Sequence, residues 1–171
     1  FKTLVQEYHD GILLFSLMEE QVWNKAVEDT VGLNAYYERN KNNYMWNERV
    51  KAIVVISNNG ENVEEIATLL SGDVTIDSVR AYLNSNKLPA SARLSFYQKG
   101  DNVNIDEMEW KEGALQIFKS TVDNSTQIIK IVELRPVEHK SFKEAKGLVT
   151  SGYQNELETL WLQQLREKYP V

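Results

Sequence analysis

The sequence contains no cysteine and has only three prolines and eight glycines. Without cysteine there is no thiol nucleophile, no zinc ribbon and no thioredoxin-type redox chemistry. The few glycines form no phosphate-binding loop. The longest strongly apolar stretch, residues 11–18, is far shorter than the ~20 residues of a transmembrane helix, so we predict no integral membrane segment.

The charge balance argues against a polyanionic partner. Nineteen basic and 25 acidic residues give a net charge of −6, so we predict that the protein does not bind nucleic acid. The hydrophobic content of 42% with 26% charged residues is typical of a globular domain. Because the chain starts at Phe1 and shows no leader peptide, we expect it to be part of a longer protein.

Residues 1–46 have helical periodicity. Apolar residues with three- and four-residue spacings, beginning at Leu4 and Tyr8, give residues 4–18 an apolar face too broad for a helix in water. Asp29 or Thr30 is the predicted cap of a second helix. At the other end of the chain, in residues 138–171, Ser141 and Glu144 form a capping-box pattern that predicts a long helix to about residue 168.

Residues 47–137 change period and predict a small sheet. The β-branched run 49–57 indicates a buried strand, and Asn62 with Glu65 and then Thr75 indicate the starts of two helices. Further strands are predicted over residues 94–97, 115–120 and 127–133, the last two as a hairpin, with a polar turn at residues 99–104.

These patterns predict an α+β fold with three parts: a helical segment 1–46, a sheet domain 47–137 and a C-terminal helix 138–171. The two helices at opposite ends of the chain each have a strongly apolar face and no partner nearby in sequence. We therefore expect the helix over residues 4–18 to pack against the C-terminal helix.

No catalytic or metal-binding constellation is visible. His9 and His139 are far apart and lack suitably spaced second ligands, so we predict no metal and no cofactor. Residues 100–106 resemble a calcium loop only superficially and are interpreted as a polar turn. Glu107 and Glu109 flank Met108 in an alternating pattern that favours the solvent-facing edge of a strand over acid–base chemistry.

Two segments of the sheet region carry a family resemblance. Residues 51–56, Lys-Ala-Ile-Val-Val-Ile, and residues 125–131, Ser-Thr-Gln-Ile-Ile-Lys-Ile, resemble the opening and closing strands of parvulin-type peptidyl-prolyl isomerases. Residues 8–15 and 165–171 look like helical segments of SurA-like periplasmic folding factors. The resemblance implies a parvulin-like small sheet with flanking helices, plus a helical unit made by the N- and C-terminal segments.

The same resemblance implies a degenerate active site. The two histidines that surround the prolyl amide in active parvulins correspond here to Val54 and Gln127. Valine has no hydrogen-bonding group and glutamine does not titrate, so the catalytic pair is missing. Aromatic and methionine side chains in the half of the domain that would hold proline are the predicted client-binding residues: Phe96, Tyr97, Met108, Trp110 and Phe118. Core packing is the competing interpretation of the aromatic side chains.

Three functions are compatible with this sequence. The first is a non-catalytic, client-binding module of a periplasmic folding factor, with unfolded or extended polypeptides, including outer-membrane protein precursors, as partners. The second is a noncanonical prolyl isomerase that works through hydrophobic surroundings alone. The third is a structural C-terminal module that completes the core of a larger chaperone.

Overall fold

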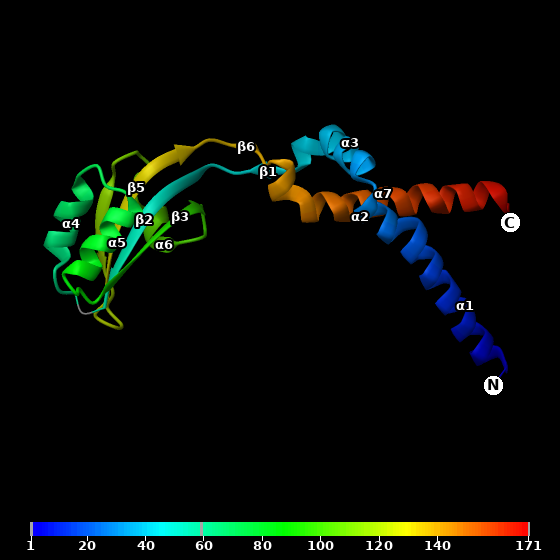
Figure 1. The fold of residues 1–171 in the computed structure, drawn as a ribbon, viewed down its shortest axis with the longest axis horizontal. Coiled ribbons are helices and arrows are strands. Elements are labelled where there is room, and N and C mark those ends of the chain that lie inside the picture. The colour runs from blue at the N-terminus through cyan, green and yellow to red at the C-terminus, as the bar shows by residue number, and fades with distance from the viewer. Residues whose placement is uncertain (1, 59, 171) are drawn as a thin grey trace. The chain divides into compact units, whose positions relative to one another are not determined.

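The computed structural model describes residues 2–58 and 60–170, and it confirms the α+β class. The chain divides into two units: a helical unit of the residues up to 45 with those from 139 onward, and a sheet domain of residues 46–138. Figure 1 shows that the first and last segments of the chain together build the helical unit. A short two-stranded sheet of β1 (Met45–Trp46) and β6 (Glu138–His139) lies where the chain passes between the units.

The sheet domain is built on four antiparallel strands in the order β3-β2-β5-β4. These strands are β2 (Arg49–Ser57), β3 (Ala90–Gln98), β4 (Leu115–Lys119) and β5 (Thr126–Arg135). In β2, the predicted strand, seven of nine residues are buried, because both faces of the sheet are covered. Strands β3 and β4 form the two outer edges.

Helices cover the two faces of this sheet. On one face, α4 (Val63–Ser71) and α5 (Ile76–Ser85) pack against Ile53, Val55 and Ile128. On the other, the short helix α6 (Val103–Glu107) and the residues after it pack against Val50, Val54 and their neighbours. The alternation along β2 therefore sends even-numbered side chains toward α6 and odd-numbered ones toward α4 and α5.

Helix α4 starts after Asn62, as predicted, but without the predicted capping-box hydrogen bonds, and the prediction around Met108 is wrong. Asn62 has left-handed backbone angles, with φ of 57°, and its side chain makes no capping hydrogen bond to α4. The alternating pattern around Met108 is not a strand edge, because Glu107 ends α6 and Met108 is buried. The predicted turn over residues 99–104 is shorter than expected. The Asn102 side chain accepts hydrogen bonds from the amides of Asn104 and Ile105 and so caps the start of α6.

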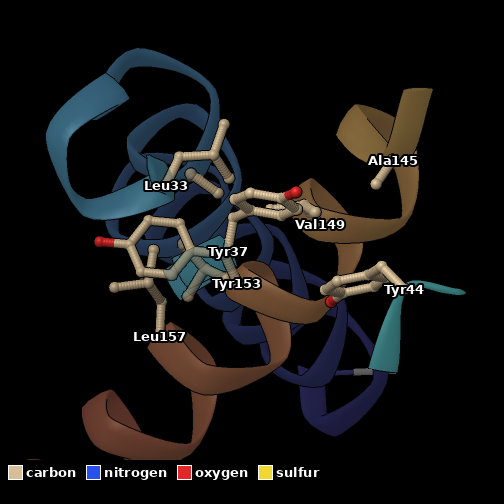
Figure 2. Close-up of a cluster of buried hydrophobic side chains, with 9 residues drawn as sticks. Leu33, Tyr37, Tyr44, Ala145, Val149, Tyr153 and Leu157 are labelled. Carbon is tan, nitrogen blue, oxygen red and sulfur yellow. The ribbon is translucent and has the colours of Figure 1, made fainter. Parts of the chain in front are cut away.

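The helical unit is arranged around α7 (Phe142–Lys168), which begins at the predicted Ser141–Glu144 capping box. Its other elements are α1 (Lys2–Met18), the π-helical η1 (Glu19–Asn24), α2 (Lys25–Glu28), α3 (Thr30–Asn40) and the 3-10 turn η2 (Lys41–Asn43). Elements η1, α2 and α3 pack on α7. Figure 2 shows the resulting core, in which Leu33 and Tyr37 of α3 meet Val149, Tyr153 and Leu157 of α7.

Helix α1 does not pack against α7, so that prediction is wrong. The buried stripe of α7, from Ala145 to Leu157, is already covered by η1, α2 and α3. Helix α1 extends from the bundle as a single helix (Figure 1), and its Phe15 makes an edge-to-face contact with Trp23, the ring centres being 5.1 Å apart. Its broad apolar face stays exposed.

Polar groups inside the helical unit lock α3 onto α7. Asp29, the predicted cap of α3, accepts the Gly32 amide at 2.8 Å through Oδ1 and the Tyr153 hydroxyl at 2.8 Å through Oδ2. The Gly32 amide, followed by Tyr153, holds the pKa of Asp29 below its usual value. A Cβ on Gly32 would lie 2.1 Å from the Tyr153 hydroxyl, so only glycine admits this contact.

The two glycines of α7 predict opposite effects of the same substitution. A Cβ on Gly152 would lie 2.5 Å from Tyr36 Oη and 2.9 Å from Tyr44 Oη, whereas one on Gly147 meets nothing within 4 Å. We expect Gly152→Ala to lower the free energy of unfolding of the helical unit by about 1–3 kcal/mol through overpacking. Gly147→Ala, the matched control, raises it by up to about 1 kcal/mol through helix propensity. Urea unfolding followed by circular dichroism measures both, and equal effects contradict the close approach.

Buried tyrosines predict that the helical unit is sensitive to alkali. Burial, followed by hydrogen bonds to Tyr36 and Asp29 respectively, raises the pKa of Tyr44 and of Tyr153 from 10.0 to about 12. A raised folded-state pKa means stability that is complete below pH ~10 and is lost as the pH rises through ~12. The urea concentration at the midpoint of unfolding should therefore decrease as the pH is raised from about 9.5 to about 11.5, a range that brackets this window. The double variant Tyr44→Phe, Tyr153→Phe should show a flatter dependence, and an unchanged slope contradicts the assignment.

Candidate functional site

Val54 and Gln127, the positions that the sequence resemblance matches to the parvulin histidines, lie together on the α6 face of the sheet. In the register of β2 and β5, Val54 faces Ile129 and Ile56 faces Gln127, which puts all four side chains on one face. Val54 and Gln127 line one hollow of about 370 Å³, together with Tyr97 of β3. The structure thus assembles these three positions into one place.

The hollow has an apolar floor and a polar rim. Val54 and Ile56 supply its apolar side chains, and Val54 is only 5% exposed. Arg93 and Asp101 are at the rim, where burial raises the pKa of Tyr97, Arg93 opposes this shift and Asp101 adds to it. The Tyr97 phenol therefore stays protonated at neutral pH.

Gln127 also lines a second hollow of about 480 Å³ next to the β4–β5 turn, which Phe118 borders. The Gln127 side-chain oxygen accepts a hydrogen bond of 3.2 Å from Asn104 Nδ2 of α6. This bond orients the glutamine between the two hollows. Of the predicted client-binding residues, Tyr97 and Phe118 therefore lie around Gln127.

The other three predicted client-binding residues lie elsewhere. Met108 is 4% exposed in the core, and Trp110 packs there too, donating from Nε1 to the Ile105 carbonyl at 3.0 Å. Phe96 is on the opposite face from Tyr97, because neighbouring residues of a strand alternate. Its ring is 40% exposed and has Arg49 5.0 Å and Lys51 5.6 Å from its centre.

Sequence reasoning missed the polar residues of this site. Arg93 enters the rim because β3 pairs it with Val54, and a single sequence carries no signal of that pairing. Asn104 reaches Gln127 because α6 folds back over the sheet. The one available signal was Asn102, whose residue type is typical of a helix cap.

The chemistry available in this site is hydrogen bonding and apolar contact. Amide, phenol and guanidinium groups bind peptide carbonyls and amides, but the lining residues include no nucleophile paired with a base. Both histidines belong to the helical unit, where His139 Nε2 lies 2.8 Å from Asn42 Oδ1. Among the residues that the structure describes, no cluster of acidic or histidine side chains suits a metal ion.

Comparison with known proteins gives only distant structural likenesses. No protein-family model and no curated protein matches the chain. Two solved structures to which it is similar are described as SurA-like chaperones.

These two structures come from work on the virulence factor PEB4 and the periplasmic protein Cj1289 of Campylobacter jejuni. One is 17% identical with a TM-score of 0.40, over 96% of this chain and 70% of its own. The other is 12% identical with a TM-score of 0.31, over 98% of this chain and 62% of its own.

The composition of the hollow predicts that the chain does not accelerate prolyl isomerisation. Rotation about a prolyl amide has a barrier near ~20 kcal/mol, which an enzyme lowers by desolvating and polarising that amide. The hollow is open and has glutamine and valine at the two expected histidine positions. A protease-coupled assay with Xaa-Pro peptides should give the uncatalysed rate. A concentration-dependent acceleration that Tyr97→Ala abolishes would establish the noncanonical isomerase instead.

Proposed function

We propose that this chain is a polypeptide-binding module of a folding factor, which holds unfolded segments and does not catalyse their isomerisation. The observation that carries the proposal is the apolar surface of α1. The periplasm as its location, and outer-membrane protein precursors among its clients, follow from the sequence resemblance and belong to the proposal.

The surface of α1 is unusually apolar for a helix that contacts so little. The exposed fractions of its large hydrophobic side chains run from 48% to 73%: Leu4, Val5, Tyr8, Ile12, Leu13, Leu14, Phe15 and Leu17. Patches of this kind on soluble proteins mark places where another polypeptide or a ligand binds. At its start, Leu4, Val5 and Tyr8 border an open apolar hollow of about 670 Å³.

The chemistry of α1 suits clients that are apolar and varied in sequence. Leucine, isoleucine and aromatic side chains make contacts that need no matched hydrogen bond, so many unfolded segments satisfy them. Among the described residues, no helix is both long and apolar enough to cross a membrane. The same surface also suits a structural module that completes a larger core, which is the alternative to be separated by experiment.

Substitutions on α1 test the proposal without touching the core. We expect the wild-type chain to suppress aggregation of a urea-unfolded outer-membrane barrel protein, and the triple variant Leu4→Gln, Tyr8→Gln, Ile12→Gln to lose most of this effect. Glutamine keeps the helix propensity while removing the apolar area. Light scattering after dilution measures the effect, which should persist in ~0.5 M salt because salt screens charges and leaves apolar burial intact.

The matched control is Val27→Gln, Val31→Gln, Leu148→Gln, three exposed apolar positions elsewhere in the helical unit. This variant should suppress aggregation as the wild type does, and all three proteins should melt alike. If the wild-type chain itself suppresses nothing, the structural-module function is favoured. Equal suppression by the α1 variant would show that α1 is not the client surface.

A further inference from the structure

The outer edge of the sheet at β3 is a second feature with the properties of a polypeptide-binding site. We propose that an extended segment rich in acidic side chains pairs with the β3 edge at Leu94 and Phe96, as an added strand. This inference deepens the proposed function, on which it rests, by naming a class of client and a place distinct from α1.

The ladder shows which backbone groups of β3 face outward. In antiparallel pairs, alternate residues exchange both hydrogen bonds with the neighbouring strand. The Asn58 amide donates to the Pro89 carbonyl at 3.2 Å, at the position just beyond the pair of Ser57 with Ala90. Odd-numbered residues of β3 therefore bond to β2, and even-numbered residues turn their N–H and C=O groups to the outer edge.

Outward-facing backbone groups of β3 have hydrogen-bond partners near both ends of the strand but not in its middle. Near its start, Arg80 of α5 donates from Nε to the Ala92 carbonyl at 3.2 Å. At its end, the Gln98 amide donates to the Asp101 carboxylate at 2.8 Å. Between them, the outward N–H and C=O groups of Leu94 and Phe96 have no hydrogen-bond partner among the described residues. An extended peptide satisfies these groups in the way that β-strand addition does.

The charge around this edge selects acidic segments. Residues 87–99 carry Lys87, Arg93 and Lys99, and the Asp101 carboxylate at this edge is hydrogen-bonded to the Gln98 amide. Arg93 is exposed and forms no ion pair within the described part of the chain. Arg80 adds a fourth positive charge directly at the edge. A bound strand with carboxylates on its side chains therefore meets opposite charge.

The opposite edge of the sheet does not share these properties. Strand β4 has five residues against nine in β3, and Ile117 and Lys119 of β4 share a hollow with Glu64 and Glu65 of α4. Carboxylates beside β4 repel an acidic segment. At β3, by contrast, the exposed ring of Phe96 offers apolar contact to a side chain of the added strand.

Hydrogen exchange and peptide binding on the whole chain test this proposal. The probe is a fluorescent ten-residue peptide in which valine or threonine alternates with glutamate, compared with the same peptide carrying lysine in place of glutamate. Binding should slow amide exchange at Leu94 and Phe96, whereas the Ser95 and Tyr97 amides are already protected in the ladder. The lysine peptide should bind at least about ten-fold more weakly by fluorescence anisotropy.

Two variants at one position separate the backbone from the side chain. Phe96→Pro removes the outward N–H and leaves the hydrogen bonds between β3 and β2 in place, and it should weaken peptide binding about ten-fold. Phe96→Ala keeps the N–H and should weaken it less. If Phe96→Pro unfolds the sheet domain, two other measurements still decide. Arg93→Gln should weaken binding of the acidic peptide about three-fold, and hydrogen exchange in the wild type should show the protection described above.

The possible outcomes are distinct. Unchanged exchange at Leu94 and Phe96, or equal affinity for both peptides, overturns the proposal. Protection that appears with rising protein concentration and no peptide assigns the edge to a second copy of the chain and also overturns it. The α1 triple variant should bind the peptide normally. If the wild-type chain suppresses aggregation but does not bind the acidic peptide, this inference alone is refuted. If the wild-type chain does neither, the proposed function is refuted as well.

Discussion

The hydrogen bond from Tyr153 to Asp29 is the contact around which the helical unit is organised. It joins α7 to the start of α3 inside an apolar core, and glycines at 32 and 152 admit the tyrosine hydroxyls at distances that a Cβ would block. This arrangement covers the buried stripe of α7 with η1, α2 and α3, and α1 takes no part in it.

In the sheet domain the corresponding constraint is the burial of β2 on both faces. Helices α4 and α5 cover one face and α6 covers the other, so the sheet offers partners only a shallow hollow and its two edges. The hollow brings Val54, Tyr97 and Gln127 together. Its side chains form hydrogen bonds without acid–base chemistry, which favours binding over catalysis.

The two proposed polypeptide-binding surfaces differ in physical character. Helix α1 offers apolar side chains, whose contacts are tolerant of sequence and insensitive to salt. The β3 edge offers backbone hydrogen bonds flanked by arginine and lysine, which favour an extended conformation and acidic side chains. A client that is partly collapsed and partly extended presents both kinds of segment, so the two surfaces together suit an unfolded chain better than either one does.

The sequence by itself determined those features that depend on neighbouring residues. The β-branched run of β2, the Asp29 and Thr75 caps and the Ser141–Glu144 box all follow from local propensity and hydrogen bonding within a few residues. The tertiary structure alone decided that α1 lacks a partner, that Asn62 adopts a left-handed conformation, and that Phe96 and Tyr97 face opposite sides of the sheet. Each of these depends on which distant segments compete for the same buried surface and on strand register, and a single sequence contains neither the competition nor the pairing.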